Sequence, residues 1–268
     1  MIRLLLLVIL WSPMAAAQMT TVRYLANEGV MVSQGDTKAL FDPLFNNGFG
    51  QYQMVPDAVR AAIFAGEPPF DGIDAVFISH YHGDHFSAED ILRLLRSQDG
   101  FRLYAPAQAV AALRDIAGPD DGALFDRITG LDIDYGDDPV SIDAGDLVIG
   151  AAHVPHAGWP TRRPEVQNLA FRVTFGDSGT VLHLGDADSR LVHFESHDYY
   201  WEDRTIDVAL PPFWFFGSDD GVEILENRLD VIDAIGIHVP DRFADPGQRP
   251  EELFIRDLFT QPGETRQF

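Results

Sequence analysis

The chain has 268 residues, a formal net charge of −23 at pH 7 and no cysteine. Because such an acidic surface repels the phosphates of nucleic acids and the headgroups of anionic membranes, neither is an expected partner. Without cysteine the chain has no disulfide bonds and no thiolate ligands, so a metal site must be built from histidine and carboxylate.

The first residues have the pattern of a cleavable signal peptide. A basic start is followed by an apolar run, 4–11, and by the small residues 15–17. The run is much shorter than the roughly 20 residues that span a bilayer, which argues against a membrane anchor. We therefore expect a cleaved signal peptide over residues 1–17 and a periplasmic or secreted domain over 18–268, with no membrane insertion after cleavage.

Apolar runs separated by turn residues predict one large, layered α/β domain. Strands are expected at 20–26, 30–33, 38–42, 74–79, 101–104, 147–152, 169–175, 180–184, 208–210 and 235–239. Helices are expected at 55–65, 88–97, 108–117, 222–234 and 250–259. Ser87 fits the N-cap of the second helix, and the acidic residues after it suit the positive end of the helix dipole.

The segment His80-Tyr81-His82-Gly83-Asp84-His85 places three imidazoles and one carboxylate directly after the predicted strand 74–79. These groups suit Zn²⁺ and similar borderline cations. A strand end holds them at a rigid edge, where a loop can gather them around a metal. A solvated polar turn is the alternative, but histidine is scarce and later segments supply matching partners.

Three later segments carry candidate ligands at the ends of apolar runs. We favour His156 over His153, because His156 lies past the strand end; His153 would then lie behind the ligands or in the core. Asp186 follows the strand 180–184, with Asp188 as the alternative carboxylate. His238 lies in an apolar strand, where a core histidine is the alternative.

Further residues are candidates for supporting the ligands or lining a pocket. Asp42 ends the predicted strand 38–42, where it could accept the free N–H of a ligand histidine or simply begin a turn. Trp159, Phe213 and Trp214 could form an aromatic wall, with burial in the core as the alternative for Phe213 and Trp214. The Arg162-Arg163 pair could bind a carboxylate or phosphate, and exposed linker arginines are the alternative.

The spacing H-x-H-x-D-H together with the later candidates resembles the ligand set of the metallo-β-lactamase superfamily. Within it, the chain is similar to the branch of single-domain metal-dependent hydrolases that includes L-ascorbate-6-phosphate lactonase and N-acyl-phosphatidylethanolamine phospholipase D. The supporting segments are 27–30, 40–43, 184–186, 207–211 and 237–240. The resemblance implies a four-layer αββα sandwich of α/β (α+β) class, with a metal site at one edge of the two sheets.

The resemblance also implies roles for the candidate residues. One metal would be held by His80, His82 and His156, a second by Asp84, His85 and His238, and Asp186 would bridge them. Asp84 and Asp186 would be the catalytic carboxylates, with Asp84 also passing on a proton. The family carries two divalent ions; we expect zinc, with manganese, iron or nickel as alternatives.

The expected function is hydrolysis of a small ester, lactone, amide or phosphodiester. The absence of cysteine argues against the lactamases that use a thiolate ligand. Relatives often have Thr or Ser after the bridging carboxylate, whereas this chain reads Gly-Asp-Ala-Asp188. The alternatives are an exported metal- or ligand-binding protein without turnover and a redox di-iron protein. The sequence predicts no particular oligomeric state.

Overall fold

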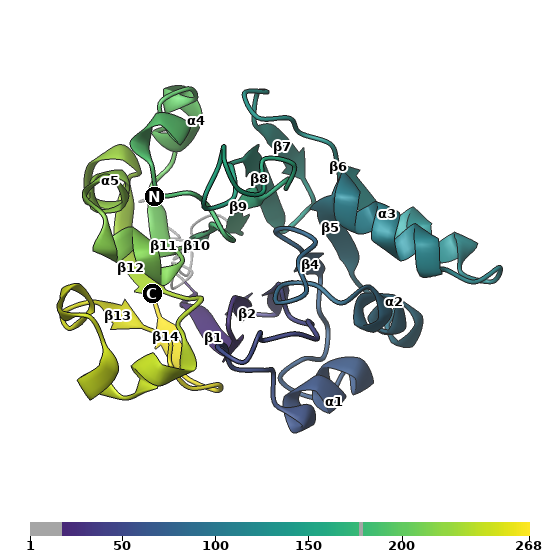
Figure 1. The fold of residues 1–268 in the computed structure, drawn as a ribbon. Coiled ribbons are helices and arrows are strands. Elements are labelled where there is room, and N and C mark those ends of the chain that lie inside the picture. Colours follow the sequence, from purple (N-terminus) through teal and green to yellow (C-terminus); the bar gives the residue numbers. More distant parts are fainter. Residues whose placement is uncertain (1–17, 177–178) are drawn as a thin grey trace, which may run out of the picture.

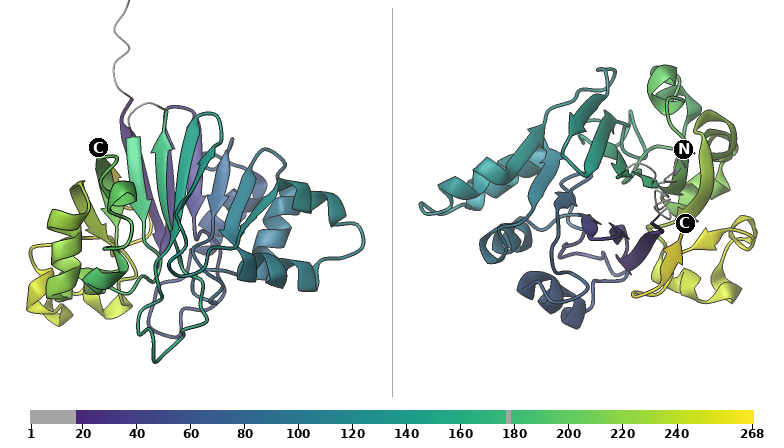
Figure 2. Two further views of the ribbon diagram at one scale, coloured as in Figure 1. Left: turned by 90° about the horizontal axis from the view of Figure 1, so that it is seen from above. Right: turned by 180° about the vertical axis from the view of Figure 1, so that it is seen from behind.

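A computed structural model describes residues 18–176 and 179–268, so the expected signal peptide lies outside the described residues. Two seven-stranded sheets pack face to face (Figures 1 and 2). In spatial order, the first sheet consists of β14 (Thr265–Gln267), β1 (Thr20–Ala26), β2 (Gly29–Gln34), β3 (Thr37–Phe41), β4 (Ala75–Phe77), β5 (Arg102–Pro106) and β6 (Ile128–Leu131). The second consists of β13 (Asp257–Leu258), β12 (Val231–Gly236), β11 (Ile206–Leu210), β10 (Gly179–His183), β9 (Leu169–Phe175), β8 (Leu147–His153) and β7 (Val140–Asp143).

Helices cover the outer faces of both sheets, which confirms the predicted αββα layers (Figure 2). The α-helices are α1 (Asp57–Ala65), α2 (Ala88–Ser97), α3 (Ala107–Ile116), α4 (Asp198–Trp201) and α5 (Asp219–Glu223). Single turns of 3-10 or π-helix occupy Gly122–Arg127, Leu191–His193, Phe213–Gly217, Ile224–Arg228, Asp241–Ala244, Pro246–Gln248 and Glu251–Leu253. None of the described helices is long and apolar enough to cross a membrane.

The core between the sheets is built from alternate strand residues that face inward. The rings of Phe41 and Phe77 stack at 4.7 Å within the first sheet, and Phe77 meets Phe171 of the second sheet at 5.0 Å. On the outer side of the first sheet, Ile91 and its neighbours on α2 are buried. Ser87 caps α2 as expected, because its hydroxyl accepts the Asp90 N–H.

Strand direction explains why functional residues can collect at one edge. In the first sheet β3, β4, β5 and β6 run parallel, and in the second β10, β11, β12 and β13 do. The carboxyl ends of neighbouring parallel strands lie at the same edge of a sheet. The loops after β3, β4, β10 and β12 therefore meet, and each of them carries a candidate residue.

Two predicted helices are wrong. The segment 222–234 is helical only to Arg228, and β12 begins at Val231, because the β-branched residues that follow add a strand beside β11. The segment 250–259 forms one short turn and then β13. Leu258 packs directly over Gly236 of β12, where no side chain intervenes, and this contact draws the segment into the sheet.

Four short strands were not predicted: β6, β7, β13 and β14. All lie at or next to a sheet edge, and most of their residues are only partly buried or exposed. These strands are only two to four residues long, which is too short for an apolar run or an alternating pattern to mark a strand in the sequence. The expected hairpin of strands 169–175 and 180–184 is present as β9 and β10.

Candidate metal centre

The loop between β4 and α2 brings four polar side chains to one edge of the sandwich. His80, Asp84 and His85 are buried there, whereas His82 is partly exposed. The loop is compact because His85 and Phe86 both donate their backbone N–H to the carbonyl of His82. This local turn explains how four side chains spaced over six residues can point to one place.

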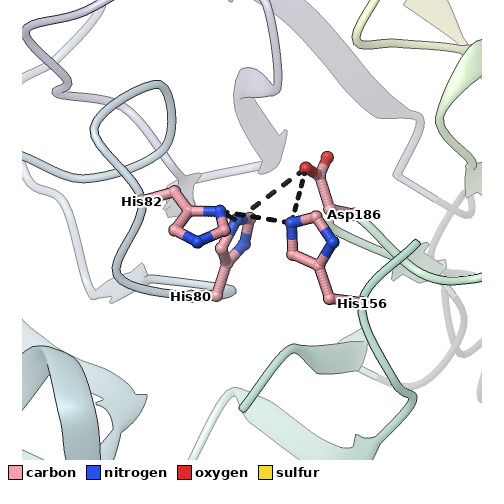
Figure 3. A group of neighbouring side chains, drawn as sticks. All are labelled: His80, His82, His156 and Asp186. Atoms are coloured by element: carbon pink, nitrogen blue, oxygen red, sulfur yellow. Dashed lines mark hydrogen bonds and ion pairs between the residues drawn. The ribbon is translucent and has the colours of Figure 1, made fainter. Parts of the chain in front are cut away.

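Three imidazoles and one carboxylate form a first group, shown in Figure 3. His82 Nδ1 lies 3.1 Å from His80 Nε2 and 3.2 Å from His156 Nε2. Asp186 Oδ2 lies 3.0 Å from His156 Nε2 and 3.9 Å from His80 Nε2. Four donor atoms from three separate loops therefore face a common point.

A second group lies on the other side of the same carboxylate. Asp186 Oδ1 is 3.3 Å from His85 Nε2 and 3.1 Å from His238 Nε2. Asp84 Oδ2 lies 3.4 Å from His238 Nε2 and 4.0 Å from His85 Nε2. Asp186 thus presents one oxygen to each group.

These donor sets fit divalent cations. Zinc ligands roughly 2.1 Å from a tetrahedral ion lie roughly 3.4 Å apart, close to the separations seen in both groups. Within residues 18–176 and 179–268, His85 Nε2, His238 Nε2 and Asp186 Oδ1 are buried without a hydrogen-bond partner. Buried polar atoms are normally satisfied, and three such atoms that face one another fit a site for a bound cation.

Buried residues behind the ligands fix the orientation of their rings. Asp42 is fully buried and accepts hydrogen bonds from the Ser79 backbone N–H at 2.7 Å and from Ser79 Oγ at 2.5 Å. Its Oδ2 lies 2.9 Å from His85 Nδ1, and Ser79 Oγ lies 3.1 Å from His80 Nδ1. Asp42 therefore lies within hydrogen-bond reach of His85 Nδ1, where it could support a ligand histidine, and Nε2 of both histidines faces the ligand groups.

The loop that carries His156 is attached to the segment 186–188. Ala157 donates its N–H to the carbonyl of Asp186, and a β-bridge pairs His156 with Ala187. The Asp188 carboxylate accepts the Gly158 N–H at 3.1 Å. Asp188, the alternative ligand considered from the sequence, thus anchors the loop beside the centre and lies outside both ligand groups.

The turn between β1 and β2 forms hydrogen bonds to two of the ligand residues, and it contains a buried acid that the sequence did not indicate. The Asn27 side chain donates to the carbonyl of Asp84 at 2.9 Å, and the Asn27 carbonyl accepts the backbone N–H of His238 at 3.0 Å. Glu28 is fully buried, with its Oε2 3.3 Å from His183 Nε2. Burial raises the pKa of the Glu28 carboxyl well above its ordinary value.

Electrostatics separate the two groups in the metal-free protein. Burial lowers the pKa of His80 well below its ordinary value, and burial followed by the nearby His156 lowers that of His82 to about 4. Burial also opposes charge on His238, but Asp186 outweighs it and raises its pKa to about 10. His80 and His82 are therefore ready to bind a cation as neutral imidazoles, whereas at His238 a metal must displace a proton.

A cavity of about 460 Å³ opens over the centre. Its lining residues are Phe49, Gln51, Tyr52, His82, Gly83, Asp84, His156, Ala157, Arg163, Asp186, Trp214 and His238. The Tyr52 ring meets the edge of His238 at 4.2 Å between ring centroids. Trp214 is the one member of the expected aromatic wall in this lining, and its indole N–H donates to the carbonyl of Ala187.

The other pocket candidates lie elsewhere. His153 ends β8, its Nδ1 lies 2.9 Å from the carbonyl of Ile133, and it lines a separate cavity. Trp159 packs against Tyr135 and His193, at 5.3 and 5.4 Å between ring centroids. Phe213 packs against Phe243. The positions of these three side chains depend on the path that the chain takes after each strand, which the identity of a single residue does not predict.

Comparison with known proteins gives a family and a fold. The family described as the β-lactamase superfamily domain matches residues 37–219. A metallo hydrolase from Ignicoccus hospitalis has 18% identity and a TM-score of 0.58 over 93% of this chain and 98% of its own. Isothiocyanate hydrolase from Delia radicum gut bacteria has 13% identity and a TM-score of 0.59 over 92% of this chain and 99% of its own.

A redox enzyme shares the same fold. CmlA, a diiron β-hydroxylase from Streptomyces venezuelae, has 14% identity and a TM-score of 0.56 over 94% of this chain and 54% of its own. No curated protein matches the chain in sequence. At these identities the solved structures show the fold alone, and the arrangement of side chains in the site has to indicate the chemistry.

Proposed function

This chain belongs to the metallo-β-lactamase superfamily, and from that premise we propose that it is a hydrolase with a two-metal centre. One observation carries the proposal: Asp186 directs Oδ2 at His156 and Oδ1 at His238, so that one carboxylate serves two groups of ligands. The first site would consist of His80, His82 and His156, and the second of Asp84, His85 and His238. The finer resemblance to particular lactonases and phospholipases stays a prediction.

The metals would supply an activated water, because coordination lowers its pKa from about 15.7 to near 7. The protein residues do the rest. Asp84 lines the cavity and lies within 3.4 Å of His238 Nε2, so it can accept and pass on a proton at the opening of the centre. Asp42 and Ser79 would orient the imidazole rings of His85 and His80, and Asp186 would contribute one oxygen to each of the two ligand groups.

We propose zinc as the resident metal, with manganese, iron or nickel as alternatives. Three imidazoles and a carboxylate are a typical zinc set, whereas the second group has two carboxylates and two imidazoles and accepts harder ions as well. The fold shared with a diiron hydroxylase makes redox chemistry the alternative to hydrolysis. Elemental analysis and metal reconstitution test this alternative, since activity of a protein that holds zinc alone would exclude redox chemistry at the metal, because zinc is redox-inactive.

We propose an exported, periplasmic or secreted enzyme that acts on a small molecule and neither binds nucleic acid nor inserts into a membrane. The sequence of residues 1–17 and the net charge of −23 support this. A cavity of about 460 Å³ suits a small ester, lactone, amide or phosphodiester. N-terminal sequencing of protein from the periplasm should find the chain starting at Gln18; an intact Met1 in the cytoplasm would contradict export.

The test of hydrolysis is a screen of metal-loaded protein against lactone, ester, amide, β-lactam and phosphodiester substrates. We expect turnover in at least one class and its loss in Asp186→Ala, whereas Asp74→Ala, an exposed carboxylate at the far end of β4, should keep it. Metal-loaded protein that is inactive on all classes would instead support the alternative, an exported metal- or ligand-binding protein without turnover.

A further inference from the structure

One charged residue of the cavity has no role in holding metal. Arg163 lines the cavity beside His82 and His156. Within residues 18–176 and 179–268, its guanidinium has no carboxylate and no hydrogen-bond acceptor. The nearby Arg190 differs, because its Nε lies 2.7 Å from Asp188 Oδ1. In a chain with 42 acidic and 19 basic residues, a cation that faces the metal cavity unpaired is available to a ligand.

The backbone holds Arg163 at this position. Its φ of +55° lies in the left-handed region that residues other than glycine rarely adopt, and such outliers concentrate at functional sites. The turn is closed on both sides: Arg162 donates its N–H to Gly158 at 2.9 Å, and Val166 donates to Arg163 at 3.2 Å. The Asp188 carboxylate anchors Gly158 in turn.

We propose that Arg163 determines substrate specificity by binding an oxyanion, a carboxylate or phosphate, on a substrate whose scissile group lies at the metal centre. This inference rests on the proposed function. A guanidinium is suited to the task because its fork of N–H groups binds two oxygens of one oxyanion at once. The rings of Phe49, Tyr52 and Trp214 line the same cavity and suit an apolar part of the same molecule.

The neighbouring Arg162 provides a matched control. It is also exposed and carries the same charge, but it is absent from the residues that line the cavity. Arg163→Gln and Arg162→Gln therefore change the net charge equally, and only the first removes a cation from the cavity. Arg163→Lys keeps the charge and loses the fork.

The experiment measures binding, so it does not depend on finding the natural substrate. The probes are short-chain hydroxamates, which chelate metal ions. Each probe carries a carboxylate, a phosphonate or a neutral carboxamide at its far end, and the chain length is varied. Calorimetry with metal-loaded protein gives the dissociation constant of each. Thermal unfolding of each variant checks that it is folded.

We expect one of the anionic tails, at its best chain length, to bind about tenfold or more tighter than the carboxamide, as charged hydrogen bonds do in partly open sites. The preferred tail distinguishes carboxylate from phosphate substrates. Arg163→Gln should abolish the preference, Arg163→Lys should reduce it, and Arg162→Gln should retain it.

Two results would overturn the inference. If hydroxamates bind but show no preference for an anionic tail, or the same preference in Arg163→Gln and Arg162→Gln, Arg163 has no such role and the metal centre stands. If no hydroxamate binds to protein supplied with metal, the metal centre itself is refuted and the inference falls with it.

Discussion

Replacing Asp42 by asparagine tests how the protein holds one half of its proposed centre. In the wild type, Asp42 accepts two hydrogen bonds from Ser79, and its Oδ2 lies 2.9 Å from His85 Nδ1. When His85 offers Nε2 to a metal, its Nδ1 carries the proton and donates to Asp42. Asparagine keeps the shape but has one acceptor oxygen, so its NH₂ group must face either the Ser79 backbone N–H or both the Ser79 hydroxyl and the His85 N–H. Either orientation also removes the negative charge that His85 Nδ1–H faces.

The expected losses of metal affinity and folding stability follow from these contacts. Loss of a partner that orients a metal-bound histidine costs about 10- to 100-fold in metal affinity. Because the Asp42 site is fully buried, a donor left without an acceptor costs about 1–3 kcal/mol of folding stability as well. Asp42→Asn should therefore bind the metal served by His85 about 10- to 100-fold more weakly and unfold at a lower temperature.

The assay is competition with a chromophoric chelator, with thermal unfolding in parallel. The matched control is Asp74→Asn, because the exposed Asp74 also accepts a backbone N–H of β3, that of Lys38 at 2.8 Å, at the opposite end of β4. Unchanged metal affinity in Asp42→Asn, or an equal loss in both variants, would refute the argument that Asp42 orients His85.

Three further predictions concern packing and protons. Gly185→Ala should lower stability by about 1–3 kcal/mol and weaken metal binding, because φ is +54° and a Cβ would lie 2.6 Å from that of Ser79; an unchanged melting temperature would contradict this. Phe171→Ala should cost about 3–5 kcal/mol in chemical denaturation while the folded protein keeps its metal; a loss of metal from folded protein would show that the core and the centre are coupled. In the metal-free protein, burial opposes charge on His238 but Asp186 raises its pKa from 6.5 to about 10, so this contribution to stability is full below pH 6.5 and lost as pH rises toward 10. Metal affinity should rise over the same interval because the metal displaces this proton. Melting curves with chelator and metal titrations across this range check both trends, and flat profiles would contradict them.

The sequence predicted the central strands well because most of their residues are apolar. The strand before His80 and the hairpin of β9 and β10 are buried along their length and lie close to where they were expected. The helices and strands of the C-terminal third were predicted less well. Apolar residues over 222–234 fit a helix as well as a strand, and the choice depends on pairing with β11, a contact with a distant part of the chain.

The candidate ligands could be identified because each one lies at or just after a strand end. Parallel pairing brings the ends of β10 and β12 to one edge, and β8, which is antiparallel to β9, points the same way as β10. His156 and His153 differ by three residues, and only the path of the chain after β8 separates them. Glu28 could not be recognised, because an acid in a short turn is normally solvated. Glu28 is buried, and Arg163 lies over the cavity, because loops from the two sheets pack together.

The most direct test of the two-metal centre is the number of metal ions bound per chain, measured by elemental analysis of protein supplied with metal. The wild type should hold two. His156→Ala should lose one ion and His238→Ala the other, leaving about one in each variant, and Asp186→Ala should hold less than one because both groups share this carboxylate. A wild type that holds at most one ion, or an Asp186→Ala variant that still holds two, would contradict the account.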